Sequence, residues 1–125
     1  MMAHPLTFPK NLRLRTPSEF SAVYASGLFE ADKILVINFK SNQQSESRMG
    51  LSIPKKAGNS PVRNQWKRHC REAFRTLQHE LPKGIDFVVR PRKGAVPKAS
   101  SVKKSLANLL KRGQKKLEKQ QCELS

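Results

Sequence analysis

Residues 48–75 read RMGLSIPKKAGNSPVRNQWKRHCREAFR, and this stretch decides the fold. It begins with apolar residues that alternate with small ones, which predicts a β-strand over residues 48–53. A turn that contains Lys, Gly, Asn and Pro follows. Ser60 and Pro61 then have the residue types of a helix N-cap and a first helical residue. The stretch therefore predicts a strand, a basic turn and a helix in immediate succession.

The predicted helix has an apolar face and a basic face. Its apolar residues recur at spacings of three and four, which is typical of a stripe that packs on a core: Val62, Trp66, Cys70, Ala73 and Leu77. Its basic residues recur at a strict spacing of four: Arg63, Lys67, Arg71 and Arg75. At 100° per residue this basic row climbs away from the edge of the apolar stripe, and Asn64 and Arg68 lie beside it.

Positive charge is concentrated in this part of the chain. The protein has 125 residues and a formal net charge of +16. Residues 1–47 contain five basic and four acidic side chains, whereas residues 48–125 contain twenty and five. A basic helix face is most often only solvated, but this one has almost no acidic residue to relieve the repulsion. Lys55 and Lys56 add charge in the preceding turn, so the pattern favours phosphate binding, with nucleic acid as the usual partner and an anionic membrane surface as the rarer one.

The other elements have clear local signals. Thr16, Pro17 and Glu19 form a capping box with Pro at the first helical position, and Gly27 ends that helix. The further elements are expected as strands at residues 33–40 and 85–90 and as a helix from about residue 100, with room for a short strand in 28–33.

The order of elements predicts an α+β fold with helices packed on a small sheet. A single domain over residues 1–125 is expected. Its first 15 residues should be extended, and a basic tail should be frayed from about 115 to 125. The polar residues 41–47 are of the kind that joins two strands in a hairpin.

The sequence lacks the signatures of several functions. The N-terminus has no signal-peptide core, and no apolar run approaches the length of a membrane span, so we expect a cytoplasmic protein. Cys70 and Cys122 should be free thiols in that compartment. His69 and His79 give no CxxC or HxxxH spacing with them, so no metal site is expected. No catalytic triad, P-loop or pair of carboxylates is recognisable, and we expect no catalytic residue.

Phe20 and Tyr24 lie one turn apart on the first predicted helix and have two interpretations. They could stack on unpaired bases. Periodicity alone favours core positions for both.

The motif R-x-G-L-S-I-x-K-K-x-G-N-S-x-V-R-N-x-x-K-R-x-x-R-E-A-F at residues 48–74 resembles the protein subunit of bacterial ribonuclease P. The resemblance extends to L-R-x-x-x-E-F-x-x-V-Y-x-x-G at residues 14–27 and covers roughly residues 8–112. It implies a small mixed sheet with a left-handed βαβ crossover, against the usual right-handed rule.

The resemblance also implies a function. The protein would assist the removal of the 5′ leader from precursor tRNA, a reaction catalysed by a large RNA subunit with Mg²⁺ held mainly by RNA. The protein alone would bind no cofactor, small-molecule substrate or membrane. Its partners would be the catalytic RNA and precursor tRNA.

The implied binding residues form two sets. The RNA-binding surface would comprise Arg48, Lys55, Lys56, Arg63, Asn64, Lys67, Arg68, Arg71 and Arg75. The leader-binding cleft would comprise Phe20, Tyr24, Leu35 and Ile37, which reverses the core interpretation of the two aromatic residues. Gln65 stands where the family's motif has an Arg, so one charge contact is in doubt.

Two other classes remain as alternatives. A structural RNA-binding protein of the ribosome would share the basic surface but would not affect tRNA processing. A protein-only nuclease would need a cluster of carboxylates, which the sequence lacks.

Overall fold

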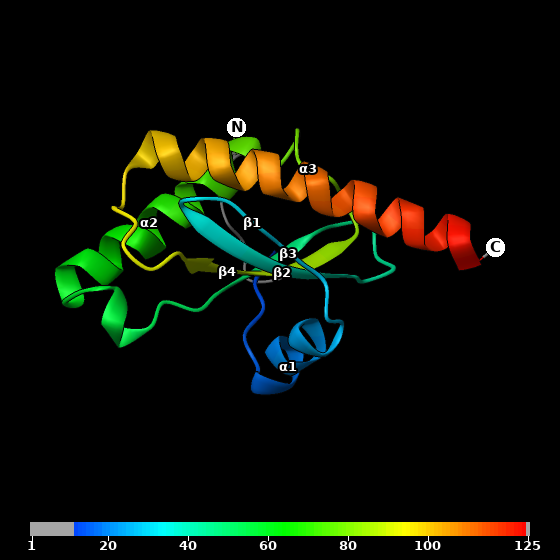
Figure 1. The fold of residues 1–125 in the computed structure, drawn as a ribbon, viewed down its shortest axis with the longest axis horizontal. Helices are drawn as coiled ribbons and strands as arrows, with labels where there is room; N and C mark the ends of the chain where they lie inside the picture. Colours follow the sequence, from blue (N-terminus) through cyan, green and yellow to red (C-terminus); the bar gives the residue numbers. More distant parts are fainter. Residues whose placement is uncertain (1–11, 125) are drawn as a thin grey trace, which may run out of the picture.

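The structure is a computed structural model that describes residues 12–124, with side chains described to residue 120. The expected elements are present, including the short additional strand. Along the chain they are α1 (Pro17–Ala25), β1 (Phe29–Ala31), β2 (Leu35–Ser41), β3 (Arg48–Leu51), the 3₁₀ helix η2 (Lys55–Ala57), α2 (Ser60–Leu77), β4 (Ile85–Pro91) and α3 (Ala99–Leu124). The chain forms three layers, in which α2 and α3 cover one face of the sheet and α1 lies on the other (Figure 1).

The sheet has the order β1-β2-β4-β3. β1 and β2 are antiparallel, β2 and β4 are antiparallel, and β3 and β4 are parallel. The expected hairpin between β2 and β3 is therefore wrong, because β4 lies between these strands. The hairpin in this fold joins β1 to β2.

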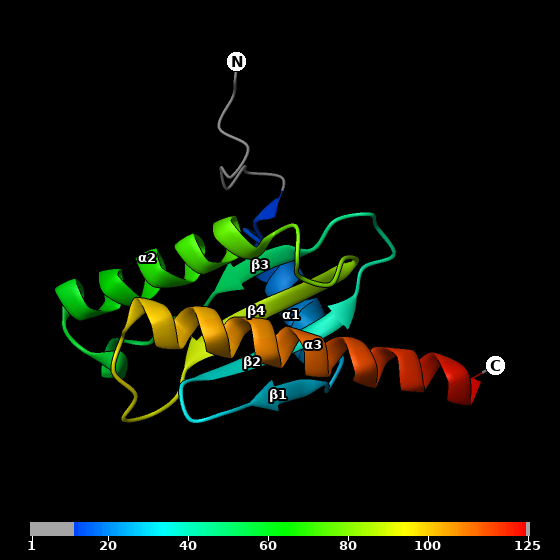
Figure 2. The ribbon, with the colours of Figure 1, turned by 90° about the horizontal axis from the view of Figure 1, so that it is seen from above.

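The connection from β3 through α2 to β4 joins two adjacent parallel strands. Figure 2 shows that the chain makes this crossover in the left-handed sense. Nearly all such connections in proteins are right-handed. The crossover places α2 over β3 and leaves its outer face at the edge of the molecule.

The main core lies between the sheet and the pair α2 and α3. Trp66, Cys70 and Leu77 of the predicted α2 stripe are buried in it, and Phe74 joins them with its ring edge-to-face on Phe87 of β4 at a centroid distance of 5.6 Å. A smaller cluster on the opposite face consists of Leu14, Val23 and Val88, with Phe20 packed against it. This second cluster holds α1 on the sheet.

α1 begins where the sequence predicts, whereas α2 begins one residue earlier than predicted. At α1 the capping box is complete, since the Thr16 side chain accepts from the Glu19 N–H and the Glu19 carboxylate accepts from the Thr16 N–H at 2.9 Å. At α2 the N-cap is Asn59 rather than Ser60, because the Asn59 side chain accepts from the Val62 N–H at 3.1 Å. Pro61 is consequently the second helical residue.

The structure describes part of the expected extended N-terminal segment and part of the expected C-terminal tail. Residues 1–11 of the expected extended segment lie outside the described residues. Arg13 forms a parallel bridge with Met49 of β3, and the Leu14 N–H donates to the Met49 carbonyl at 3.0 Å. α3 includes most of the expected tail, since it ends at Leu124.

One buried contact allows α3 to lie close to the sheet. A Cβ atom on Gly113 would be 3.3 Å from the ring of Phe39 in β2. Gly113 therefore does more than weaken the helix, since it makes room for a core aromatic ring.

A carboxylate joins the β1–β2 turn to α3. Asp32 accepts hydrogen bonds from the backbone of Ile34 and Leu35 and from the Ser105 hydroxyl, the last at 2.6 Å. Burial by itself would raise the pKa of Asp32, but the hydrogen bond from Ser105 and those from the backbone together lower it.

Candidate nucleic-acid interface

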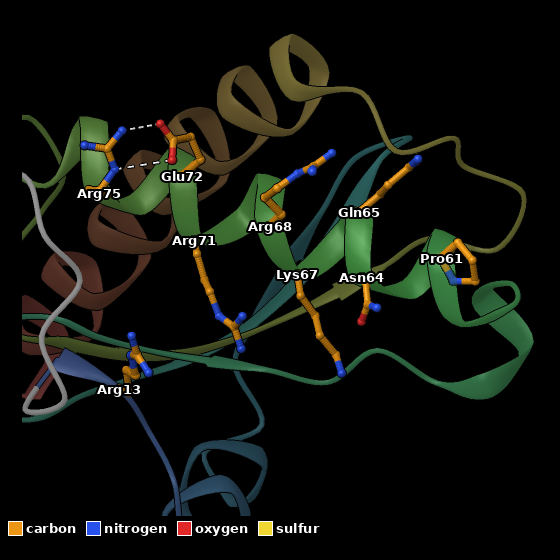
Figure 3. A pocket seen from close by; sticks show the side chains of 9 residues that line it. All are labelled: Arg13, Pro61, Asn64, Gln65, Lys67, Arg68, Arg71, Glu72 and Arg75. Carbon is orange, nitrogen blue, oxygen red and sulfur yellow. Dashed lines mark hydrogen bonds and ion pairs between the residues drawn. The ribbon is translucent and has the colours of Figure 1, made fainter.

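The basic row of α2 (Arg63, Lys67, Arg71 and Arg75) begins beside the core stripe and turns away from it toward the end of the helix. Lys67, Arg71 and Arg75 of this row, together with neighbouring residues, line an open groove on the surface (Figure 3). The groove is lined by Arg13, Pro61, Asn64, Gln65, Lys67, Arg68, Arg71, Glu72 and Arg75. Asn64, Lys67 and Arg71 extend from one side of α2, whereas Gln65 and Arg68 extend from the other.

The cations of this surface differ in how strongly other protein groups hold them. Arg75 pairs with Glu72 one turn earlier in the helix. Arg63 donates to the Ser60 hydroxyl at 3.1 Å. Within the described part of the chain, the side chains of Lys67, Arg68 and Arg71 make no hydrogen bond or ion pair.

Three unpaired cations within residues 67–71, a little more than one turn of α2, repel one another in the free protein. Because nearby phosphate groups would relieve this repulsion, the arrangement favours an anionic partner. Guanidinium groups can bind a phosphate through two hydrogen bonds at once, which makes Arg68 and Arg71 the stronger candidates.

The turn before α2 extends the positive surface. Lys55 and Lys56 are exposed on η2. Gly58 ends η2 with φ at +146°, and a Cβ there would lie 2.7 Å from Val62. Only glycine fits this close approach, so the turn that presents the two lysines at the start of α2 depends on it.

Arg48, which was predicted to lie on the RNA-binding surface, is held within the framework of the protein. Its Nε and Nη2 donate to the two oxygens of Asp86 at 2.9 and 2.6 Å, and its Nη1 donates to Glu19 at 2.9 Å. Asn42 completes the cluster with a hydrogen bond of 2.8 Å to Asp86. The guanidinium thereby joins β3 to the neighbouring strand and to α1. A sequence pattern cannot reveal this role, because Asp86 is 38 residues away.

Glu19 is held in its charged form by the start of α1. Hydrogen bonds from the backbone N–H groups of Arg15 and Thr16 lower the pKa of the Glu19 carboxyl to about 2, and Arg48 contributes to this shift. The carboxylate thus caps the helix and anchors it to β3.

The four residues predicted to form the leader cleft differ in their exposure. Tyr24 is 40% exposed, and Phe20 is half-buried against Leu14 and Val88. Neither aromatic ring is part of the main core.

Leu35 and Ile37, however, cannot line a binding surface in this structure. Both are completely buried in the main core, on the face of β2 that α2 and α3 cover. Side chains alternate along a strand, so the face beside α1 carries their neighbours Val36 and Asn38. Both are half-buried.

The face that α1 partly covers continues across β4. Arg90 pairs with Val36 in the strand register, and its Nη2 donates to the Asn38 side chain at 3.1 Å. We call Val36, Asn38, Val88 and Arg90 the α1 face. Asn38, a polar residue within an apolar run, was the sequence signal that could have identified it.

No three His, Cys, Asp or Glu side chains come together as a possible metal site within the part of the chain that the structure describes. The Cys70 thiol is free, and burial raises its pKa to about 12. Among the described residues, no helix is long and apolar enough to cross a membrane.

Comparisons with known proteins agree on one family. The model of the family Ribonuclease P matches residues 8–114. The ribonuclease P protein component of Bacillus cereus is 38% identical over 113 residues, which are 88% of this chain and 98% of that protein. That of Streptococcus pneumoniae is 35% identical, with 82% of this chain and 84% of that protein covered.

Solved structures show the same likeness. The RNase P protein from Thermotoga maritima, solved with 1-(4-fluorophenyl)-2-thiourea, is 35% identical with a TM-score of 0.75, covering 80% of this chain and 98% of that one. A mutant RNase P protein from Staphylococcus aureus is 28% identical with a TM-score of 0.76, covering 84% and 90%.

The chain belongs to the ribonuclease P protein family. Its function is that of the protein subunit of the ribonuclease P ribonucleoprotein, an endoribonuclease that processes tRNA. These matches give no support to the ribosomal alternative.

Proposed function

We propose that this chain binds the 5′ leader of precursor tRNA on its α1 face and the catalytic RNA along α2. The observation that carries the proposal is the set of unpaired cations Lys67, Arg68 and Arg71 on an exposed helix. Asn64 and Gln65 supply hydrogen-bonding amides beside them. Such groups bind phosphate and orient an RNA backbone.

In this proposal the protein positions RNA, and the chemistry belongs to the RNA subunit. The Mg²⁺ ions that the reaction uses would be held mainly by that RNA. The surface formed by α2 and η2 is rich in cations and amides, which would lower the repulsion between leader and catalytic RNA. We therefore assign no catalytic residue to the protein.

The aromatic residues of α1 give the leader a second kind of contact. Stacking of a base on an aromatic ring tolerates any sequence and contributes roughly 1–3 kcal/mol per base. Tyr24 is the better candidate because it is more exposed than Phe20. Val36 and Asn38 replace Leu35 and Ile37 as the β2 residues of this surface.

The first test is reconstitution with a bacterial ribonuclease P RNA at low Mg²⁺. We expect the full-length protein to accelerate cleavage of precursor tRNA, and Lys67→Gln/Arg71→Gln to lose much of this effect. Lys103→Gln/Lys104→Gln on exposed positions of α3 is the matched control, because it removes the same charge elsewhere. Equal activity of the two double variants would show that α2 is only a solvated surface.

The second test separates the leader from the rest of the substrate. Tyr24→Ala should weaken binding of precursor tRNA by about 1–3 kcal/mol and leave binding of mature tRNA unchanged. Equal losses for both RNAs would place Tyr24 outside the leader site.

A further inference from the structure

An exposed aromatic side chain lies on the edge strand β1, beyond the four residues of the α1 face. Phe29 is 54% exposed, more than any other aromatic side chain that the structure describes. It follows the sequence motif that ends at Gly27, and the motif gives it no role. A single exposed apolar residue needs no explanation by itself, so the position of Phe29 decides what it can do.

The strand register places Phe29 on the same face of the sheet as the proposed leader site. Phe29 is the partner of Asn38 in β2, and Asn38 is the partner of Val88 in β4. Directly opposed residues point to the same side of a sheet. Gly50 of β3 continues this row, and a Cβ atom on it would lie 2.8 Å from the end of the Phe20 ring. The row therefore crosses the sheet from one aromatic ring to another.

The space between the two rings suits an extended RNA strand. The row covers about 14 Å from Gly50 to Phe29, since adjacent strands lie about 4.8 Å apart. Arg90 lies beside its middle and donates to the Asn38 side chain at 3.1 Å. Aromatic rings spaced along a surface that also carries a cation are typical of proteins that bind single strands.

Lys116 of α3 holds β1 and its ring in place. Its ammonium group donates to the Phe29 carbonyl at 3.0 Å and pairs with Glu30 at 2.8 Å. The same group lies 5.9 Å from the centroid of the Phe29 ring, within the range of a cation–π attraction. β1 is only three residues long, so these contacts fix the edge strand to α3. A ring that is already held in position loses less conformational freedom when it binds a base.

We propose that Phe29 stacks on a base of the 5′ leader, at the end of the leader path farthest from the catalytic RNA. The inference rests on the proposed function and extends its leader site to the edge of the sheet. β1 and β3 are the two opposite edges (Figure 2), and α2, the proposed contact to the catalytic RNA, lies over β3. A leader that follows the row from Phe20 therefore reaches Phe29 with the nucleotides most distant from the cleavage site.

A series of leader lengths tests this placement. The full-length protein is assembled with a bacterial ribonuclease P RNA, and the ligands are precursor tRNAs with leaders of two or eight nucleotides and mature tRNA. Phe29→Leu keeps the apolar bulk and removes the ring, whereas Phe29→Tyr keeps the ring and is the matched control. We expect Phe29→Leu to bind the long-leader substrate about tenfold more weakly, as the loss of one stacked base predicts. The other two ligands should bind unchanged, and Phe29→Tyr should bind all three as the parent does.

Three results would overturn the inference. Phe29→Leu that binds the long-leader substrate as tightly as the parent would remove the ring from the leader path. Equal losses for all three ligands, together with a lower Tm, would show that the ring only supports the edge strand. Equal losses for both leaders, with mature tRNA unchanged, would place the ring beside the cleavage site instead.

Tyr24→Ala in the same series separates this inference from the proposed function. If Tyr24→Ala weakens binding of the leader and Phe29→Leu does not, the inference fails and the proposed function stands. If the parent protein gives precursor tRNA no advantage over mature tRNA, the proposed leader site itself is refuted.

Discussion

Arg48→Met is the variant that best distinguishes a structural role from RNA binding. The change keeps the apolar stem of the side chain and removes three hydrogen bonds to carboxylates. The Asp86 side chain is only 6% exposed, and it would keep only its bond from Asn42. Breaking a buried pair by removing one partner costs about 3–5 kcal/mol. Because Arg48 and Glu19 are 21% and 27% exposed, water can reach part of the site, and we expect a loss of about 2–3 kcal/mol.

Two measurements make the comparison. Urea unfolding should show the lost stability, and thermal unfolding should show a fall in Tm of roughly 6–15 °C for a domain of this size. Binding of single-stranded RNA, measured over a range of salt concentrations well below the Tm, should keep the slope of the parent protein. Lys67→Met provides the contrast, since its slope should fall by about 0.7 while its stability changes by no more than about 0.5 kcal/mol.

A double-mutant cycle tests the pairing itself. Asp86→Asn alone should also destabilise the protein, and Arg48→Met/Asp86→Asn should be more stable than the sum of the single effects predicts, by about 0.5–3 kcal/mol. The structural role of Arg48 is refuted if Arg48→Met unfolds at the Tm of the parent and lowers the salt slope as Lys67→Met does.

Three further predictions concern Glu19, Gly113 and Gly50. The pKa of Glu19 is lowered from 4.5 to about 2, so its stabilising contribution is complete above pH 4.5 and is lost as the pH falls toward 2; urea midpoints measured across this range should fall less steeply in Glu19→Gln. Gly113→Val should destabilise the protein by about 1–3 kcal/mol in the same assay, since even the Cβ atom would lie 3.3 Å from the Phe39 ring. Gly50→Ala would place a Cβ atom 2.8 Å from the end of the Phe20 ring. We therefore expect this variant to lose more affinity for precursor tRNA than for mature tRNA, relative to the parent protein, when both are measured by filter binding. Equal losses for the two RNAs would contradict this.

The helices and strands could be predicted from local sequence, but their arrangement could not. The capping box at Thr16 needs only neighbouring residues, and α1 begins where it indicates. The start of α2 was misplaced by one residue because Asn59 and Ser60 are both short polar side chains that can cap a helix. Strand order depends on pairing between distant segments, so no local pattern could show that β4 separates β2 from β3.

The same distinction applies to the candidate site. The basic row follows from helical spacing, and the structure shows Arg71 exposed and Arg63, Lys67 and Arg75 half-buried. The run from Ile34 to Ile37 is apolar throughout, so it has no alternation from which to choose a face of β2. The resemblance placed Leu35 and Ile37 in the leader cleft, and the local pattern offered no check on this, but the structure buries both side chains in the main core. The sequence does not distinguish Arg48 from the other cations, because its partners Glu19 and Asp86 are distant in sequence.

The position of β4 has a consequence for folding of the chain during its synthesis on the ribosome. β4 is the last strand to be synthesised, yet β2 and β3 both pair with it and not with each other. A nascent chain that ends before residue 85 therefore has two strands whose central partner does not yet exist, and α2 emerges before the sheet that supports it is complete. Non-local pairing of this kind slows folding and leaves apolar strands exposed in the meantime. Stable folding of this chain must await the synthesis of its last third.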